Sequence, residues 1–224
     1  MRFFLQNNVG HGTVLLYTLP KGADVMREYI IVKKPEVLDW DKIPVAPIDN
    51  ILWNMPAEGI EAKGQMCYDE KNLYVRLTTK EVHIKAQYTG ELDFPNNDSC
   101  LEIYLCPMDG DNRYFNIEVN PNGLLLQGLG RSFWDLIRFK PLHPNIHPVS
   151  EYIEGGWRTT YSVPLEYFTE FFPGFEFKSG KTMRGNFYKC GDECVQAHYY
   201  SWSPITTEVP NFHYVPDFGK LIFE

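Results

Sequence analysis

Residues 100–120, CLEIYLCPMDGDNRYFNIEVN, decide the fold class. Residues 100–106 and 114–120 alternate apolar with polar side chains and are rich in aromatic and β-branched residues, which is typical of strands. Asp109 and Gly110 between them favour a turn. The stretch therefore predicts an antiparallel hairpin.

The alternation gives each strand of this hairpin an apolar face and a polar face. The apolar faces predict core residues, which are Leu101, Ile103, Leu105, Phe115, Ile117 and Val119. The polar faces carry Glu102, Tyr104, Tyr114, Asn116, Glu118 and Asn120. A turn centred near Asp109 would place Tyr104 opposite Tyr114, Glu102 opposite Asn116 and Cys100 opposite Glu118. Alternation alone fits an ordinary solvated sheet face.

The composition of the polar face points to sugar binding. Carboxylates and amides accept and donate hydrogen bonds to hydroxyl groups, and aromatic planes cover the apolar C–H faces of a sugar. The segment from 184 to 213 adds polar and aromatic candidates, namely Tyr188, His198, Trp202, Phe212 and His213. A tryptophan on a sandwich strand is more often a core residue than a ligand platform.

The rest of the chain predicts further short strands between 16 prolines. These strands are expected at residues 73–77, 124–127, 157–163, 184–189, 198–203 and 220–223. One short helix is expected at 165–172, and a long irregular loop at 132–150. Short strands separated by turn residues predict an all-β fold, an antiparallel β-sandwich of immunoglobulin or jelly-roll type, in a single domain over 1–224.

Charge and cysteine content narrow the function classes. The net charge of −8, without a basic cluster, excludes nucleic acid and anionic membranes as expected partners. Five cysteines do not form an evident disulfide framework. Cys190, Cys194 and His198 are a weak metal pattern, because no CxxC pair is present.

The start of the chain has no evident targeting signal. Gln6, Asn7 and Asn8 interrupt any apolar run there, so neither a signal peptide nor a membrane span is expected. The compartment would be the cytoplasm, or the periplasm or the outside of the cell if a leader has been trimmed.

Six motifs in order resemble carbohydrate-binding module family 9-like domains, over about 53–224. The motifs are DSCLEIYL, YFNIEVNPNG, WRTTYSVPLEYF, GNFYKCGDE, YYSWSPI and PNFHYVPDFGKLIF. Such domains occur attached to xylanases and as stand-alone proteins of polysaccharide-degrading bacteria. The resemblance implies non-catalytic binding of the ends of plant-type polysaccharides or oligosaccharides, in support of polysaccharide breakdown.

The resemblance also implies site residues. Glu102 matches the acid of the family, Glu118 and Asn120 fall at sugar-contacting positions, and Phe212 matches one ring of an aromatic clamp. The second ring is usually a Trp shortly before the acidic strand, and here Phe94 is the aromatic available. No cofactor is required, although the family often binds structural calcium, for which Asp109, Asp111 and Asn112 are candidate ligands.

Two alternatives stay open. A glycoside hydrolase or lyase would use a pair of carboxyl groups such as Glu102 and Glu118. The predicted register offsets these two acids diagonally on an open sheet face, which argues against catalysis. A protein-interaction β-sandwich would instead use the exposed tyrosines and tryptophans as a binding hot spot.

Overall fold

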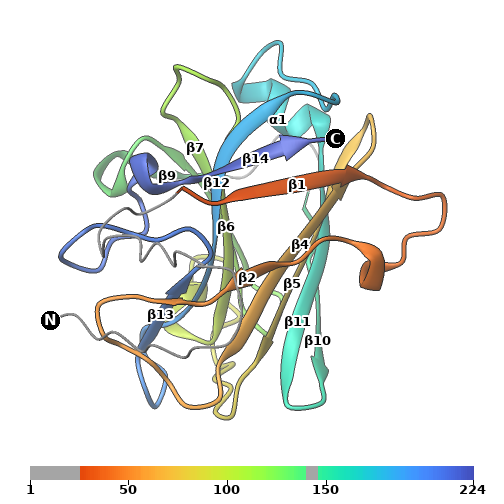
Figure 1. Ribbon diagram of the computed structural model, residues 1–224. Helices are drawn as coiled ribbons and strands as arrows, with labels where there is room; N and C mark the ends of the chain where they lie inside the picture. Colours follow the sequence, from red (N-terminus) through yellow and green to blue (C-terminus); the bar gives the residue numbers. More distant parts are fainter. Residues whose placement is uncertain (1–25, 140–145) are drawn as a thin grey trace, which may run out of the picture.

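The computed structural model describes residues 26–139 and 146–224, which form a curled β-sheet with one α-helix (Figure 1). The strands follow one hydrogen-bonded path in the order β10-β11-β5-β4-β1-β14-β12-β6-β7-β8-β9. The first half of the path contains β10 (Val149–Ile153), β11 (Gly156–Pro164), β5 (Asn72–Lys80) and β4 (Glu61–Tyr68), with β2 (Ala46–Ile48) paired to β4. The second half contains β14 (Gly219–Phe223), β12 (Thr182–Gly191), β6 (Cys100–Cys106), β7 (Tyr114–Val119), β8 (Leu125–Gly130) and β9 (Ile137–Arg138), with β13 (His198–Ser201) and β3 (Asn50–Ile51) attached through β12.

Strand β1 (Glu28–Lys33) joins the two halves, and it corrects the expectation of purely antiparallel pairing. It runs parallel to β14 along one stretch and parallel to β4 along the next. Figure 1 shows β1 lying beside β14 and crossing over β4. Because β1 changes partner along its length, the sheet turns back on itself at this strand.

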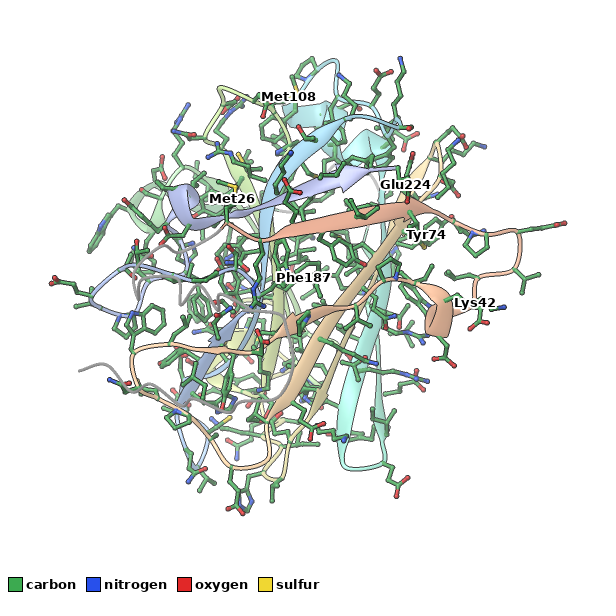
Figure 2. The ribbon with its side chains drawn as sticks, in the orientation of Figure 1. Met26, Lys42, Tyr74, Met108, Phe187 and Glu224 are labelled. Carbon is green, nitrogen blue, oxygen red and sulfur yellow. The ribbon has the colours of Figure 1, made fainter. Side chains whose placement is uncertain are left out.

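The hydrophobic core lies between the two halves. The six core residues predicted from the hairpin are all fully buried in it. The halves approach closely where β4 crosses β12, since a Cβ atom at Gly64 would lie 2.3 Å from the ring of Phe187. Phe187 occupies the middle of the molecule in Figure 2. A side chain larger than glycine at position 64 would push the two halves apart.

The predicted helix is confirmed as α1 (Leu165–Phe171). Its residues Tyr167 and Phe168 contact Phe115 of β7, with ring centroids 4.7 and 5.5 Å apart. No helix among residues 26–139 and 146–224 has both the length and the apolar character needed to cross a bilayer.

The stretch 132–150 differs from the irregular loop expected there. It contains the 3-10 helix η3 (Phe133–Asp135), strand β9 and the beginning of β10, while residues 140–145 lie outside the described part. The frequent prolines of this stretch had favoured the prediction of a loop over that of short strands and turns. The first residues, for which no leader was expected, also lie outside the part of the chain that the structure describes. All five cysteines are free thiols, as the absence of a disulfide pattern predicted.

Candidate functional site

The register of β6 and β7 brings Glu102 directly opposite Glu118. The predicted register, with Cys100 opposite Glu118, is wrong by two residues. The reason is the turn, whose centre falls at Gly110 rather than Asp109, with Gly110 in the left-handed conformation at φ 78°. A shift of two residues leaves every side chain on its predicted face.

The polar face of this hairpin is buried, contrary to the open sheet face that was expected. Glu102 is 1% exposed and Glu118 is 6% exposed. The side chains of Leu52, Phe212, Val215 and Phe218 pack on this face in a second hydrophobic cluster. The strands of this half are therefore covered on both faces, and the acids lie at the bottom of a depression.

That depression is a cleft of about 840 Å³. Its acidic lining residues are Glu102, Glu118 and Asp192, and its aromatic lining residues are Trp53, Phe94, Tyr104, Phe133, Trp134, Tyr199 and Phe212. Asn96, Asn97, Asn211, Arg138 and His213 add further polar groups. Such a lining combines flat apolar rings with convergent hydrogen-bonding groups, as small-molecule sites do.

A stack of three rings stiffens one part of the cleft. The Phe212 ring lies 4.1 Å from Tyr188 with an interplanar angle of 8°, and 5.7 Å from Trp53 with an angle of 28°. The Tyr188 hydroxyl donates to the Phe212 carbonyl over 3.0 Å, and the Trp53 indole donates to the Thr207 carbonyl over 2.8 Å. Trp53 also has a positive φ of 50°, which is unusual for a bulky residue and typical of ligand sites. The rings are held in place before any ligand arrives.

The second aromatic group belongs to η3. The Asp135 carboxylate accepts hydrogen bonds from the backbone N–H groups of Arg131 and Ser132, over 2.8 and 2.7 Å, which fixes this single turn. Trp134 is 91% exposed although it lines the cleft. An exposed tryptophan beside a cleft is available to stack on a ligand.

The two glutamates are held by neighbouring donors but keep unused oxygen atoms. The Cys190 thiol donates to Glu102 Oε1 over 2.9 Å, and the Asn116 amide donates to Glu118 Oε1 over 2.9 Å. Oε2 of each glutamate is buried without a hydrogen-bond partner. Burial raises the pKa of both carboxyl groups, that of Glu118 to about 7, and the charge of Glu118 raises the pKa of Glu102 further. The pair can therefore both donate and accept near neutral pH.

His213 completes the base of the cleft between two tyrosines. Its Nδ1 lies 2.7 Å from the Tyr114 hydroxyl and its Nε2 lies 3.4 Å from the Tyr104 hydroxyl. Burial lowers the pKa of this imidazole to about 4, so the ring is neutral at pH 7. It offers hydrogen bonding rather than positive charge.

The structure brings five of the eight predicted site residues into the cleft. These are Phe94, Glu102, Glu118, Phe212 and His213. Tyr188 lies behind Phe212 and supports it. Asn120 shapes the turn after β7, where its amide donates to Asp98 over 2.9 Å and its oxygen accepts from the Leu124 N–H over 2.9 Å. Trp202 is only 2% exposed and belongs to the core between the halves, which corrects its assignment to the sugar site.

The calcium candidates in the β6–β7 turn have positively charged partners of their own. The Asp111 carboxylate accepts a hydrogen bond from Arg113 Nε over 2.9 Å, and Asn112 Oδ1 accepts one from Arg184 over 2.9 Å. Asp109 adds no contact that draws the three side chains together. The guanidinium groups argue against a calcium ion in this turn.

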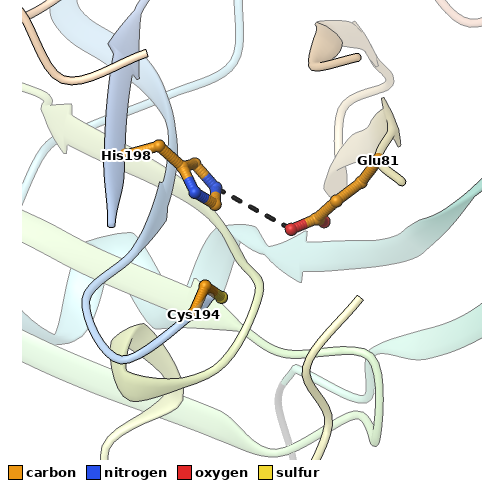
Figure 3. Close-up of side chains that lie close together, drawn as sticks. All are labelled: Glu81, Cys194 and His198. Atoms are coloured by element: carbon orange, nitrogen blue, oxygen red, sulfur yellow. Dashed lines mark ion pairs between the residues drawn. The ribbon is translucent and has the colours of Figure 1, made fainter. Parts of the chain in front are cut away.

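A second cluster of possible metal ligands lies away from the cleft (Figure 3). It joins Glu81, Cys194 and His198, whereas Cys190 points to the opposite face of β12 and contacts Glu102. The Lys189 ammonium lies 2.7 Å from His198 Nε2 and 3.2 Å from Glu81 Oε1. A lysine provides the positive charge beside Glu81 and His198, so these side chains form a buried ionic network.

Several cleft residues were missed because they lie in loops or on unexpected elements. Trp53 follows β3, Trp134 lies in η3, and Asp192 follows β12. The sequence SFWD at 132–135 does carry a usable signal, since Ser followed three residues later by an acid is a helix-start pattern. Nothing local indicated that this turn would reach the acids of β6 and β7.

Comparison with known proteins agrees with this architecture. The model of carbohydrate-binding family 9 matches residues 32–223. A crystal structure of a proposed carbohydrate-binding protein from Bacteroides uniformis is 27% identical, with a TM-score of 0.78 over 89% of this chain and 100% of that one. Two structures of a family 9 module from Caldicellulosiruptor kristjanssonii share the fold. The complex with glucose is 13% identical with a TM-score of 0.61, and the complex with cellotriose is 12% identical with a TM-score of 0.62. Each comparison covers 88% of this chain, and 96% and 94% of the respective relative.

Comparison with curated protein sequences found no match. The matched stretch begins before residue 53, where the resemblance read from the sequence starts, and includes the last two residues of β1, Val32 and Lys33. The chain belongs to carbohydrate-binding family 9.

Proposed function

We propose that the cleft binds the end of a plant-type oligosaccharide or polysaccharide chain without cleaving it, in support of polysaccharide breakdown. The observation that carries the proposal is the pair of buried glutamates with unused oxygens beneath exposed aromatic rings. Sugar hydroxyls would satisfy the free oxygens, and the rings of Trp134 and Trp53 would cover the C–H faces. The glucose and cellotriose bound to the Caldicellulosiruptor modules make glucose-containing chains the first ligands to test.

The position of the acids supports binding over hydrolysis. A glycosidase places its two carboxyl groups on either side of the scissile bond. Glu102 and Glu118 are instead direct neighbours on adjacent strands, so both reach the ligand from the same floor. The raised pKa values of Glu102 and Glu118 favour a catalytic alternative. Chromatography of the sugars after incubation distinguishes the two, because hydrolysis would release shorter products.

We expect Trp134→Ala and Phe212→Ala each to weaken cellotriose binding by about 1–3 kcal/mol, the usual cost of losing an aromatic anchor. Isothermal titration of the folded proteins measures this. Tyr152→Ala is the matched control, since Tyr152 is an exposed ring of β10 that does not line the cleft. Equal affinity of all four proteins would contradict the site assignment. A complete lack of sugar binding by the wild type would instead favour a protein-interaction role.

A further inference from the structure

The cleft contains three carboxylates without a matching set of cations. Glu102 and Glu118 come from β6 and β7, and Asp192 comes directly after β12. Burial raises the pKa of all three groups. Like charges brought together in a depression raise each other's energy unless a ligand or a proton compensates them.

The cationic side chains nearest to the cleft are already engaged. Among the described residues, Arg138 is the one arginine or lysine in the lining. Its guanidinium donates to the carbonyls of Leu92 and Asp93, each over 2.7 Å, and lies 5.0 Å above the ring of Phe94. Its charge favours the ionised form of Glu118, but burial outweighs it. Lys189 lies on the other face of β12 with Glu81.

When the two glutamates of the floor are ionised, their unused oxygen atoms are all acceptors. Oε2 of Glu102 and Oε2 of Glu118 are buried and lack a donor. A ligand that fits them must supply several N–H or O–H donors at one point. An ammonium group supplies three donors, has no lone pair, and carries the positive charge that the carboxylates lack.

We propose that the carbohydrate preferred by this cleft is an amino sugar whose protonated amine lies against Glu102 and Glu118. This inference rests on the carbohydrate binding of the proposed function, and it names for the same site a ligand class that differs from neutral plant-type chains. A metal ion is the other cation to consider, because Cys100, Glu102 and Cys190 lie close together. Burial raises the pKa of both thiols, so they are protonated and a metal would have to displace two protons.

The test is isothermal titration at pH 7 in the presence of EDTA with four monosaccharides. These are glucose, glucosamine, 6-amino-6-deoxyglucose and N-acetylglucosamine. At least one of the two amino sugars is expected to bind about tenfold or more tightly than glucose, as a charge-assisted hydrogen bond in a buried site allows. For glucosamine, acetylation keeps the nitrogen but removes its charge, so any advantage should disappear with N-acetylglucosamine.

Two variants assign the effect to the acids. Glu118→Gln keeps the shape of the side chain and should reduce the ratio of amino-sugar to glucose affinity several-fold. Asp192→Asn serves the same purpose at the most accessible of the three acids if the buried substitution impairs folding. Glu166→Gln on α1 is the control and should leave the ratio unchanged.

The outcomes separate this inference from the proposed function. Glucose binding with no gain for either amino sugar would overturn the amine assignment and leave carbohydrate binding intact. A gain that persists in both Glu118→Gln and Asp192→Asn would also overturn it. Failure of all four sugars, and of cello-oligosaccharides and chitosan oligosaccharides, would contradict the proposed function itself.

Discussion

Replacing Lys189 with Met is expected to lower the free energy of unfolding by about 3–5 kcal/mol, the usual cost of removing one partner of a buried ion pair. The Lys189 side chain is fully buried, and that of Glu81 is 2% exposed. Lys189 Nζ donates to Glu81 Oε1, to the Cys190 carbonyl over 2.8 Å and to His198 Nε2. Without the lysine, the Glu81 carboxylate would stay buried with only neutral donors, those of Ser99 and Trp157.

Urea unfolding at pH 7 measures this loss. Lys178→Met is the matched control, because the Lys178 side chain is 67% exposed and its loss should cost less than about 0.5 kcal/mol. The double variant Glu81→Gln with Lys189→Met should be more stable than Lys189→Met alone, since it removes the unpaired charge. A loss below about 1 kcal/mol for Lys189→Met would contradict a stabilising role for the buried ion pair of Lys189 and Glu81.

Trp202→Ala is expected to lower the free energy of unfolding by about 3–5 kcal/mol, as large-to-small substitutions in cores do. The Trp202 ring packs at 5.7 Å from Phe187 and 6.2 Å from Tyr29, edge to face. It also lies so close to β14 that a Cβ atom at Gly219 would be 2.4 Å from it. A cavity of this size in the core cannot close without moving β14.

The comparison with Trp134→Ala makes this prediction specific. Trp134 is almost fully exposed, so its loss should reduce sugar affinity and leave stability nearly unchanged. Trp202→Ala should reduce stability and leave sugar affinity nearly unchanged, at a temperature where the variant is folded. Denaturation measures the free energy of unfolding of both variants, and titration measures their sugar affinities. Loss of affinity in folded Trp202→Ala, with stability unchanged, would return Trp202 to the binding site.

The alternation of residues predicted the faces of β6 and β7 but not their pairing. Faces depend on a period of two along one strand, so Glu102 and Glu118 stayed on the same side when the register moved. The register depends on where the turn is centred, and the left-handed conformation falls at Gly110. The direct pairing of the two acids, which determines the chemistry of the site, therefore needed the structure.

The walls of the cleft were the least predictable part. Trp53 and Trp134 have no strand periodicity, and their approach to Glu102 depends on how distant loops pack over β6 and β7. Trp202 was assigned to the site because it lies in an aromatic motif, yet it follows β13 directly and packs in the core between the two halves. The parallel pairing of β1 could not be predicted either, since the sequence of a six-residue strand does not indicate which strands it pairs with.

Titration of isotopically labelled protein with cellotriose, observed through the five tryptophan indole N–H signals, tests the cleft assignment most directly. Trp53 and Trp134 line the cleft, while Trp40, Trp157 and Trp202 are buried elsewhere. The signals of Trp53 and Trp134 should shift in a saturable way, and the other three should stay in place. Saturable shifts confined to Trp40, Trp157 or Trp202 would contradict the assignment of this cleft as the sugar site.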